Sequence, residues 1–186
     1  MIQQVNSFYQ IPVTENTLVV LDIDETIMAF PNITKTWWRE TYEKYFDSTG
    51  DKTTADNLTL NEWREHVQVC KPYLLDEEKF KIFLSQIKSN TSQLVLLTAR
   101  DPIMTEITHL HLSHCELSIS PEQVIHDENK GDALAQIIQS YPEITNIIFV
   151  DDFEKNLISV KDRFSQDDMK NYNIKLYQIT HKTTGN

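Results

Sequence analysis

An apolar run followed at once by two carboxylates constrains this chain more than any other feature of its sequence. Residues 18–21 are all apolar, and Asp22 and Asp24 come directly after them. A short apolar run of this kind is typical of a strand buried on both faces, as in a parallel sheet. Open parallel sheets bind ligands beyond the carboxyl ends of their strands. Because residues two apart in a strand share a face, Asp22 and Asp24 are expected to approach one ligand together.

Two carboxylates held this close repel each other, so the pair needs a cation or a shared proton to relieve it. One interpretation is a solvated turn at the end of a strand. The other is a site for metal-assisted phosphoryl transfer, which predicts further acids, a cation and a small hydroxyl at other strand ends. The residues that follow the other apolar runs distinguish the two.

Polar side chains also stand at the ends of later predicted elements. A second apolar strand, residues 93–97, ends at Thr98, and a third ends at Asp151 and Asp152. Lys130 stands at the start of a predicted helix. The helix dipole disfavours a cation there unless an anion is also bound, although an ordinary surface lysine is the simpler alternative. Several such residues at one edge of a sheet favour the phosphoryl-transfer interpretation.

The alternation of predicted strands and helices indicates a layered α/β fold. We expect strands at 18–21, 93–97, 123–126, 146–150 and 174–179, and helices at 76–87, 103–114, 130–140 and 154–163. Right-handed crossovers between them predict a three-layer Rossmann-like parallel sheet of about five strands, with helices on both faces. Residues 1–16 are interpreted as an irregular lead-in, and the acid pair Asp167 and Asp168, which follows no apolar strand, as solvated surface.

An insert is predicted between the first strand and the rest of the sheet. The expected organisation is a core formed by residues 1–30 and 76–186, with a small helical insert at 31–75. Two helices are expected in the insert, over 33–46 and 60–70, joined by a polar loop. All three tryptophans of the chain fall in this insert. They form either a stacking platform for an aromatic substrate or the core of a small helical lobe.

Composition limits the partners of the protein. A chain of 186 residues can bury a substantial core as one domain with a modest insertion. Its net charge of −11 argues against sequence-independent binding to nucleic acid or to an anionic membrane. The two cysteines lack CxxC spacing, and the first ten residues lack the basic and apolar parts of a signal peptide. No apolar run approaches the roughly 18 residues needed to span a bilayer. We therefore expect a cytoplasmic protein, although export by a leaderless route is compatible with the sequence.

Together these motifs resemble the four motifs of the haloacid dehalogenase (HAD) superfamily of aspartate-nucleophile phosphatases. The resemblance extends from residue 18 to about residue 180, and is greatest to a bacterial branch with a small helical cap. The residues that carry it are Asp22, Asp24 and Thr26, Thr98 at the end of a strand, Lys130 before a helix, and Asp151 with Asp152.

The resemblance implies a role for each of these side chains. Asp22 would be the nucleophile that forms an aspartyl-phosphate, and Asp24 would protonate the leaving oxygen and then deprotonate the attacking water. Thr98 would donate to a phosphoryl oxygen, and Lys130 would neutralise charge on nucleophile and phosphate. Arg100 is left open between a contact to the substrate phosphate and a cap on its own strand exit.

The same resemblance implies Mg²⁺ as the cofactor. The implied ligands are Asp22, the backbone carbonyl of Asp24, Asp151 and Asp152. Thr26 and the backbone at Ala99 would help to seat the phosphoryl group.

The implied function is a magnesium-dependent phosphomonoester hydrolase. The acid at position 24 favours dephosphorylation over the cleavage of carbon–halogen bonds and over the stable phosphoaspartate of ion pumps. A phosphotransferase and a catalytically inactive module that binds phosphorylated ligands are the alternatives. A small cap leaves an open mouth, so the expected substrate is a phosphorylated small molecule or a macromolecular phosphoester. The protein would act as a monomer or a homodimer, without stable binding of nucleic acid.

Overall fold

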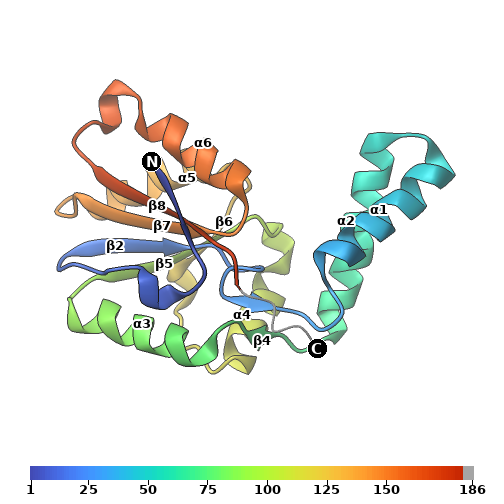
Figure 1. Cartoon of the computed structure of the whole chain (residues 1–186), viewed down its shortest axis with the longest axis horizontal. Coiled ribbons are helices and arrows are strands. Elements are labelled where there is room, and N and C mark those ends of the chain that lie inside the picture. Colours follow the sequence, from blue (N-terminus) through green and yellow to red (C-terminus); the bar gives the residue numbers. More distant parts are fainter. Residues whose placement is uncertain (182–186) are drawn as a thin grey trace.

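The computed structural model describes residues 1–181 and contains a six-stranded sheet with helices on both faces (Figure 1). The strands lie in the order β1-β8-β7-β2-β5-β6, and all neighbouring pairs are parallel. Their bounds are β1 Ile2–Val5, β2 Thr17–Leu21, β5 Gln93–Thr98, β6 Val124–His126, β7 Asn146–Asp151 and β8 Asn173–Ile179. This arrangement confirms the predicted α/β fold.

Each face of the sheet packs on its own pair of helices, so β2 is enclosed from both sides. Its alternate residues divide between two apolar clusters: Val19 and Leu21 pack with α3 and α4, while Leu18 and Val20 pack with α5 and α6. All four side chains have no exposed surface. The helices are α3 Glu77–Ser89, α4 Thr105–His114, α5 Lys130–Ile137 and α6 Glu154–Phe164, with short 3-10 helices η1 Phe8–Gln10, η2 Pro102–Met104, η3 Pro121–Gln123, η4 Ile138–Ser140 and η5 Asp167–Met169.

Strand β1 corrects the prediction of about five strands. The sequence predicts an irregular lead-in over residues 1–16, but β1 pairs with β8 at one edge of the sheet, with Ile2 opposite Leu176 and Val5 opposite Ile179. An edge strand has one partner strand and needs few apolar residues. The two residues in the middle of β1 are exposed glutamines. A search for apolar runs therefore does not detect this strand.

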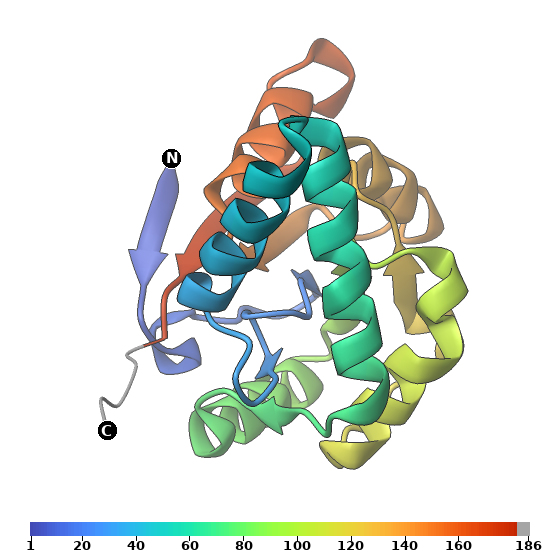
Figure 2. The same cartoon turned by 90° about the vertical axis from the view of Figure 1, so that its right-hand side faces the viewer.

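The predicted insert is a hairpin of two helices, α1 (Lys35–Thr49) and α2 (Lys52–Val69), which projects from the core beyond the end of β2 (Figures 1 and 2). Helix α2 begins at Lys52 rather than near residue 60. Gly50 ends α1 in the left-handed conformation, with φ 65°, and the Asp51 carboxylate accepts a hydrogen bond from the Thr54 amide at 2.8 Å. These two caps shorten the connection to a tight turn.

Two short antiparallel strands join the base of the hairpin. They are β3 (Met28–Ala29) and β4 (Tyr73–Leu74), and the amide of Leu75 also donates to the carbonyl of Ile27 at 3.0 Å. The chain therefore enters and leaves the hairpin at adjacent points. Two-residue strands carry no readable alternation, so the sequence did not indicate them.

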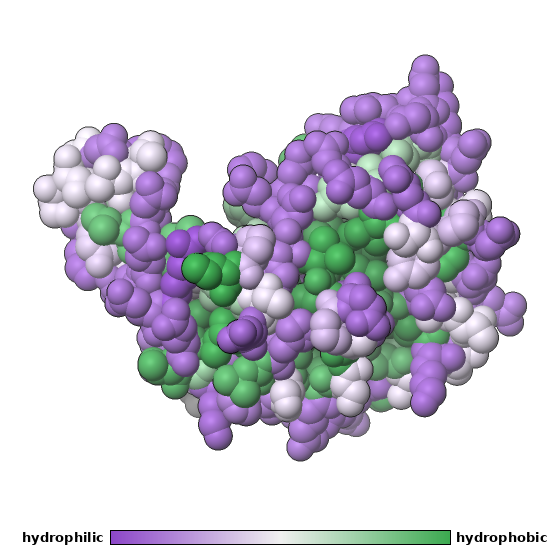
Figure 3. Space-filling view, turned by 180° about the vertical axis from the view of Figure 1, so that it is seen from behind, coloured by the Kyte–Doolittle hydropathy of each residue, from purple (hydrophilic) through white to green (hydrophobic). Residues whose placement is uncertain are grey.

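The tryptophans of the hairpin pack against one another and against the core. The ring centroids of Trp37 and Trp38 lie 5.2 Å apart, and those of Trp38 and Trp63 lie 6.0 Å apart. Trp63, only 6% exposed, belongs to one apolar cluster with Phe30 and with Met104 of η2. This packing favours the interpretation of the tryptophans as the core of a small lobe. Seen from behind, an open recess still separates the outer part of the hairpin from the core (Figure 3).

Within residues 1–181, no helix is both long enough and apolar enough to cross a membrane.

Candidate active site

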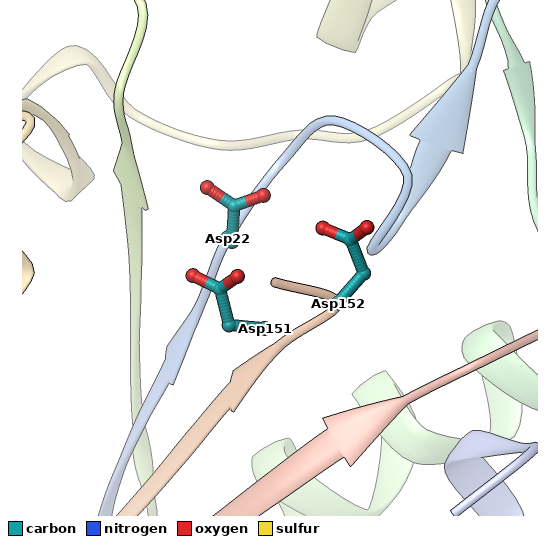
Figure 4. Close-up of side chains that lie close together, drawn as sticks. All are labelled: Asp22, Asp151 and Asp152. Atoms are coloured by element: carbon teal, nitrogen blue, oxygen red, sulfur yellow. The ribbon is translucent and has the colours of Figure 1, made fainter. Parts of the chain in front are cut away.

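Asp22, Asp151 and Asp152 meet at the carboxyl ends of β2 and β7, where Asp151 is the last residue of β7 (Figure 4). The two strands are parallel neighbours with Leu21 opposite Val150, so the residues that follow them emerge at the same edge. One carboxylate oxygen of each acid lies within 4.8 Å of those of the other two. Oxygens bound to one Mg²⁺ at about 2.1 Å lie at most about 4.2 Å apart. The three acids therefore lie close to the spacing that one divalent ion requires.

Burial makes all three carboxyls hard to ionise. It raises the pKa of Asp22, and the ammonium of Lys130 opposes this rise while Asp24 adds to it. Burial and then the charge of Asp22 raise the pKa of Asp151 well above its ordinary value. The same two causes raise the pKa of Asp152 to about 7. A buried cluster with more acids than cations is the environment in which a bound metal ion stabilises the ionised forms.

Hydrogen bonds from neighbouring groups hold Asp151 and Asp152 at the end of β7. The Phe153 amide donates to Oδ1 of Asp151 at 2.8 Å, and the Asn156 side chain donates to both of its carboxylate oxygens at 3.1 and 3.0 Å. The Asp152 amide donates to Oγ1 of the fully buried Thr26 at 3.0 Å. Thr26 thus joins the loop after β2 to the end of β7, and its contact to a phosphoryl group stays a prediction.

Lys130 reaches the acids from the first turn of α5. Its side chain is fully buried, and Nζ donates to Oδ1 of Asp22 at 2.8 Å and to the carbonyl oxygen of Leu97. Gly131 lets α5 lie close against α6, because a Cβ at this position would lie 2.5 Å from the carbonyl oxygen of Ser159. The burial excludes the alternative of an ordinary surface lysine, and Asp22 is the anion that a cation at a helix start requires.

Thr98 and Ala99 stand at the exit of β5, the other neighbour of β2. Leu96 lies opposite Leu21, which brings this exit to the same edge as Asp22. Thr98 is fully buried, and its Oγ1 accepts a hydrogen bond from the Arg100 amide at 3.2 Å. Its hydroxyl keeps its own hydrogen for donation. Ala99 is exposed at the strand end.

The carboxylate of Asp24 is held by Arg100. Nε of Arg100 donates to Oδ2 at 2.8 Å and NH2 donates to Oδ1 at 2.7 Å, so the pair is bidentate. The arginine side chain has no exposed surface, whereas that of Asp24 is 29% exposed. Neither interpretation of Arg100 from the sequence describes this contact. Its position just after the exit of the strand beside β2 was the available signal, because that exit faces the loop that carries Asp24.

Comparison with known proteins identifies the family of the chain. Residues 1–128 and 124–185 match a family described as proteins of unknown function, DUF2608. The chain belongs to the DUF2608 family. No curated protein matches this DUF2608 sequence.

Two solved structures resemble this DUF2608 chain. One is the class C acid phosphatase from Bacillus anthracis, with a TM-score of 0.49 and 16% identity; the similarity covers 93% of this chain and 69% of the phosphatase. The other is the same phosphatase with tungstate bound, with a TM-score of 0.48, 15% identity and the same coverage. At these values the similarity says nothing about reaction or substrate, so the chemistry of the DUF2608 chain has to be judged from its own residues.

A cavity of about 940 Å³ opens beside Asp152 in this DUF2608 chain. Its walls come from the loop after β2, the start of α1, the β4 region and the end of β8, and they include Glu25, Lys35, Tyr73 and Lys79. The walls carry both signs of charge. Asp152 is the member of the acid cluster that lines this cavity, and Asp22 and Asp151 are not among its lining residues.

The acid cluster of the DUF2608 chain predicts a pH-dependent stability. The folded protein keeps a proton on Asp152 up to a pKa of about 7, whereas the unfolded chain loses it near the ordinary value of 3.8. Between these values the folded state binds more protons, so the free energy of unfolding of chelator-treated protein falls as pH rises. Between about pH 5 and about pH 7.5 we expect the free energy of unfolding to fall by roughly 2 kcal/mol, which corresponds to a fall in Tm of about 5 °C.

Excess Mg²⁺ should counteract this fall, because it binds ionised carboxylates. Differential scanning calorimetry with and without the ion, at about pH 5 and about pH 7.5, measures both effects. The Tm increase should be larger at the higher pH and should shrink in Asp152→Asn. An equal increase at both pH values would contradict the prediction.

Proposed function

We propose that this chain is a divalent-metal-dependent phosphomonoester hydrolase that acts through a phosphorylated aspartate. The observation that carries the proposal is the position of the Asp22 carboxylate. It lies 2.8 Å from the buried ammonium of Lys130 and within 4.8 Å of oxygens of Asp151 and Asp152. A carboxylate nucleophile, a cation and a set of oxygen ligands around one point are what phosphoryl transfer through an aspartate requires.

The three acids suit Mg²⁺ as the metal. Their donor atoms are all carboxylate oxygens, which favour hard divalent cations. Asp22, Asp151 and Asp152 would hold the ion, with the backbone carbonyl of Asp24 as a proposed further ligand. When bound, the ion would neutralise charge on the phosphoryl group and on the acids.

In the proposed reaction an oxygen of Asp22 attacks phosphorus, and the bond from phosphorus to the leaving oxygen breaks. Asp24, in its protonated form, gives its proton to that oxygen. Water then attacks the aspartyl-phosphate while Asp24 takes back a proton, and phosphate leaves as Asp22 is restored. Lys130 and the hydroxyl of Thr98 stabilise the negative charge of the phosphoryl oxygens in both steps.

We further propose that the chain is a HAD-type phosphatase with a core of residues 1–30 and 76–186 and a cap of residues 31–75. The pairing of β3 with β4 at the base of the hairpin supports this division. The cavity beside Asp152 supports a phosphorylated small molecule or an exposed macromolecular phosphoester as substrate.

Turnover of p-nitrophenyl phosphate tests the proposed function. The protein should release p-nitrophenol with Mg²⁺ present and lose this activity with a chelator. Acid quenching during turnover, followed by mass spectrometry of peptides, should find a phosphoryl group on Asp22. Adding an alcohol separates hydrolysis from phosphotransfer, because a transferase forms a new phosphoester. No turnover of any compound in a broad panel of phosphomonoesters, or a phosphoryl group on another residue, would overturn the proposal.

A further inference from the structure

The guanidinium of Arg100 contacts helix α4 as well as Asp24. Its NH1 donates to Oγ1 of Thr108 at 3.1 Å and lies 3.1 Å from Nδ1 of His111. Arginine can only donate hydrogen bonds, so Nδ1 of His111 accepts and the ring hydrogen is on Nε2. Nε2 therefore donates to the carbonyl oxygen of Val67, 2.9 Å away in the last turn of α2.

The surroundings of His111 keep Nδ1 as the acceptor and Nε2 as the donor. Its side chain is buried, with 1% exposure. Burial, and then the charge of Arg100, lower its pKa to about 4, so the ring stays neutral at physiological pH. Both ring nitrogens are used, one toward Arg100 and one toward the hairpin. A continuous chain of hydrogen bonds thus runs from Val67 through His111 and Arg100 to Asp24.

Two aromatic rings, one from the insert and one from the residue just before it, lie near the same guanidinium. The central carbon of Arg100 lies 5.7 Å from the ring centroid of Phe30 and 5.9 Å from that of Trp63 in α2. Phe30 also contacts His111 edge-on, with centroids 4.9 Å apart. The hairpin therefore supplies two contacts to this pair, a backbone carbonyl and an indole ring, while the others come from α4, from Phe30 and from the loop after β2.

We propose that Arg100 and His111 are positioning residues that couple the seating of the α1–α2 hairpin on the core to the orientation of the Asp24 carboxylate. The inference rests on the proposed function, in which Asp24 transfers the proton. A bidentate guanidinium fixes a carboxylate in one plane. Displacement of the hairpin removes the acceptor of His111 and the ring beside Arg100, and Asp24 loses its fixed plane.

The variant His111→Leu tests this coupling, with His114→Leu on the exposed side of the same helix as its control. Two substrates are compared: an alkyl phosphate, whose leaving oxygen needs a proton, and p-nitrophenyl phosphate, whose leaving group needs little help. Hydrolysis of the aspartyl-phosphate is common to both substrates, so kcat/KM, which reports the step in which the leaving oxygen departs, is the quantity compared. A misplaced general acid should lower kcat/KM for the alkyl phosphate about 10- to 100-fold, and for p-nitrophenyl phosphate less than about 3-fold.

A conservative variant separates positioning from simple destabilisation. His111→Gln keeps an amide donor for Val67 and a carbonyl acceptor for Arg100, so it should restore part of the alkyl phosphate turnover lost in His111→Leu. An equal loss of kcat/KM on both substrates, or no loss on either, would overturn the inference.

A second measurement changes Asp24 and observes the effect on the hairpin. It does not depend on enzymatic activity. Asp24→Asn removes the ion pair, so backbone hydrogen exchange in the last turn of α2 should become faster, while the exposed control Asp167→Asn leaves it unchanged. Unchanged exchange in Asp24→Asn would refute the coupling even if the wild-type protein is an active phosphatase. If the wild-type protein turns over no phosphomonoester, the proposed function fails, whatever the exchange experiment shows.

Discussion

Asp22→Asn should abolish turnover, with kcat lowered on the order of 10⁴-fold or more. The amide is a poor nucleophile and cannot form the aspartyl-phosphate. The substitution also removes the charge that faces Lys130 at 2.8 Å and one of the three clustered acids. Steady-state turnover of p-nitrophenyl phosphate measures the loss, and the phosphorylated peptide should be absent from acid-quenched samples.

Folding has to be checked in the same variant, because Asp22→Asn has two opposing effects on stability. It relieves the repulsion that raises the pKa of Asp151, and it takes the counter charge from the buried Lys130. Asp167→Asn is a matched control, since the side chain of Asp167 is 92% exposed and forms only a surface ion pair with Lys170. Turnover by a folded Asp22→Asn protein at more than a few per cent of the control rate would refute the role of Asp22.

Lys130→Met should lower kcat by about 10²- to 10³-fold and also destabilise the fold. Methionine fills a similar volume without the charge. The loss of the ammonium leaves Asp22 and the Leu97 carbonyl without the donor that Nζ provides. Breaking a buried ion pair by removing one partner costs about 3–5 kcal/mol. The pKa of Asp22, which Lys130 holds down against burial, rises further, so less of the nucleophile is ionised at neutral pH.

Thermal unfolding and turnover together test the effect of Lys130→Met. Lys88→Met at the exposed end of α3 is the control for loss of a lysine charge. The Tm deficit of Lys130→Met should shrink toward about pH 5, because protonation of the clustered acids removes the charge that has lost its partner. A deficit that does not depend on pH would show that lost packing, rather than the unpaired acid, causes the destabilisation.

The parallel sheet explains why much of the site could be predicted from the sequence. Strands β2, β5 and β7 each contain four consecutive apolar residues, and parallel pairing places their carboxyl ends at one edge whatever lies between them in sequence. The positions of Asp22, Asp151 and Asp152 next to one another follow from that pairing. The fold prediction was correct in class for the same reason.

The contacts of Arg100 could not be predicted in this way. Its guanidinium reaches residues from the loop after β2, from α4 and from α2, and the direction of a long side chain depends on how these elements pack. His111 gave a similarly weak signal, because a buried histidine in a helix has the same local sequence pattern as a surface one. The edge strand β1 was missed because exposed glutamines occupy its middle, and the pairing of β3 with β4 was missed because two-residue strands show no alternation.

The chain enters the hairpin at Met28–Ala29 and leaves it at the adjacent Tyr73–Leu74. This attachment has a consequence for how proteins of this architecture can diversify. A unit attached through two neighbouring backbone segments can be lengthened, trimmed or exchanged without re-routing the sheet, so selectivity can change while the reacting groups stay in place. The carbonyl of Val67 is the exception. Under the proposed coupling, any replacement unit has to present an equivalent acceptor to His111, or the orientation of the Asp24 carboxylate changes.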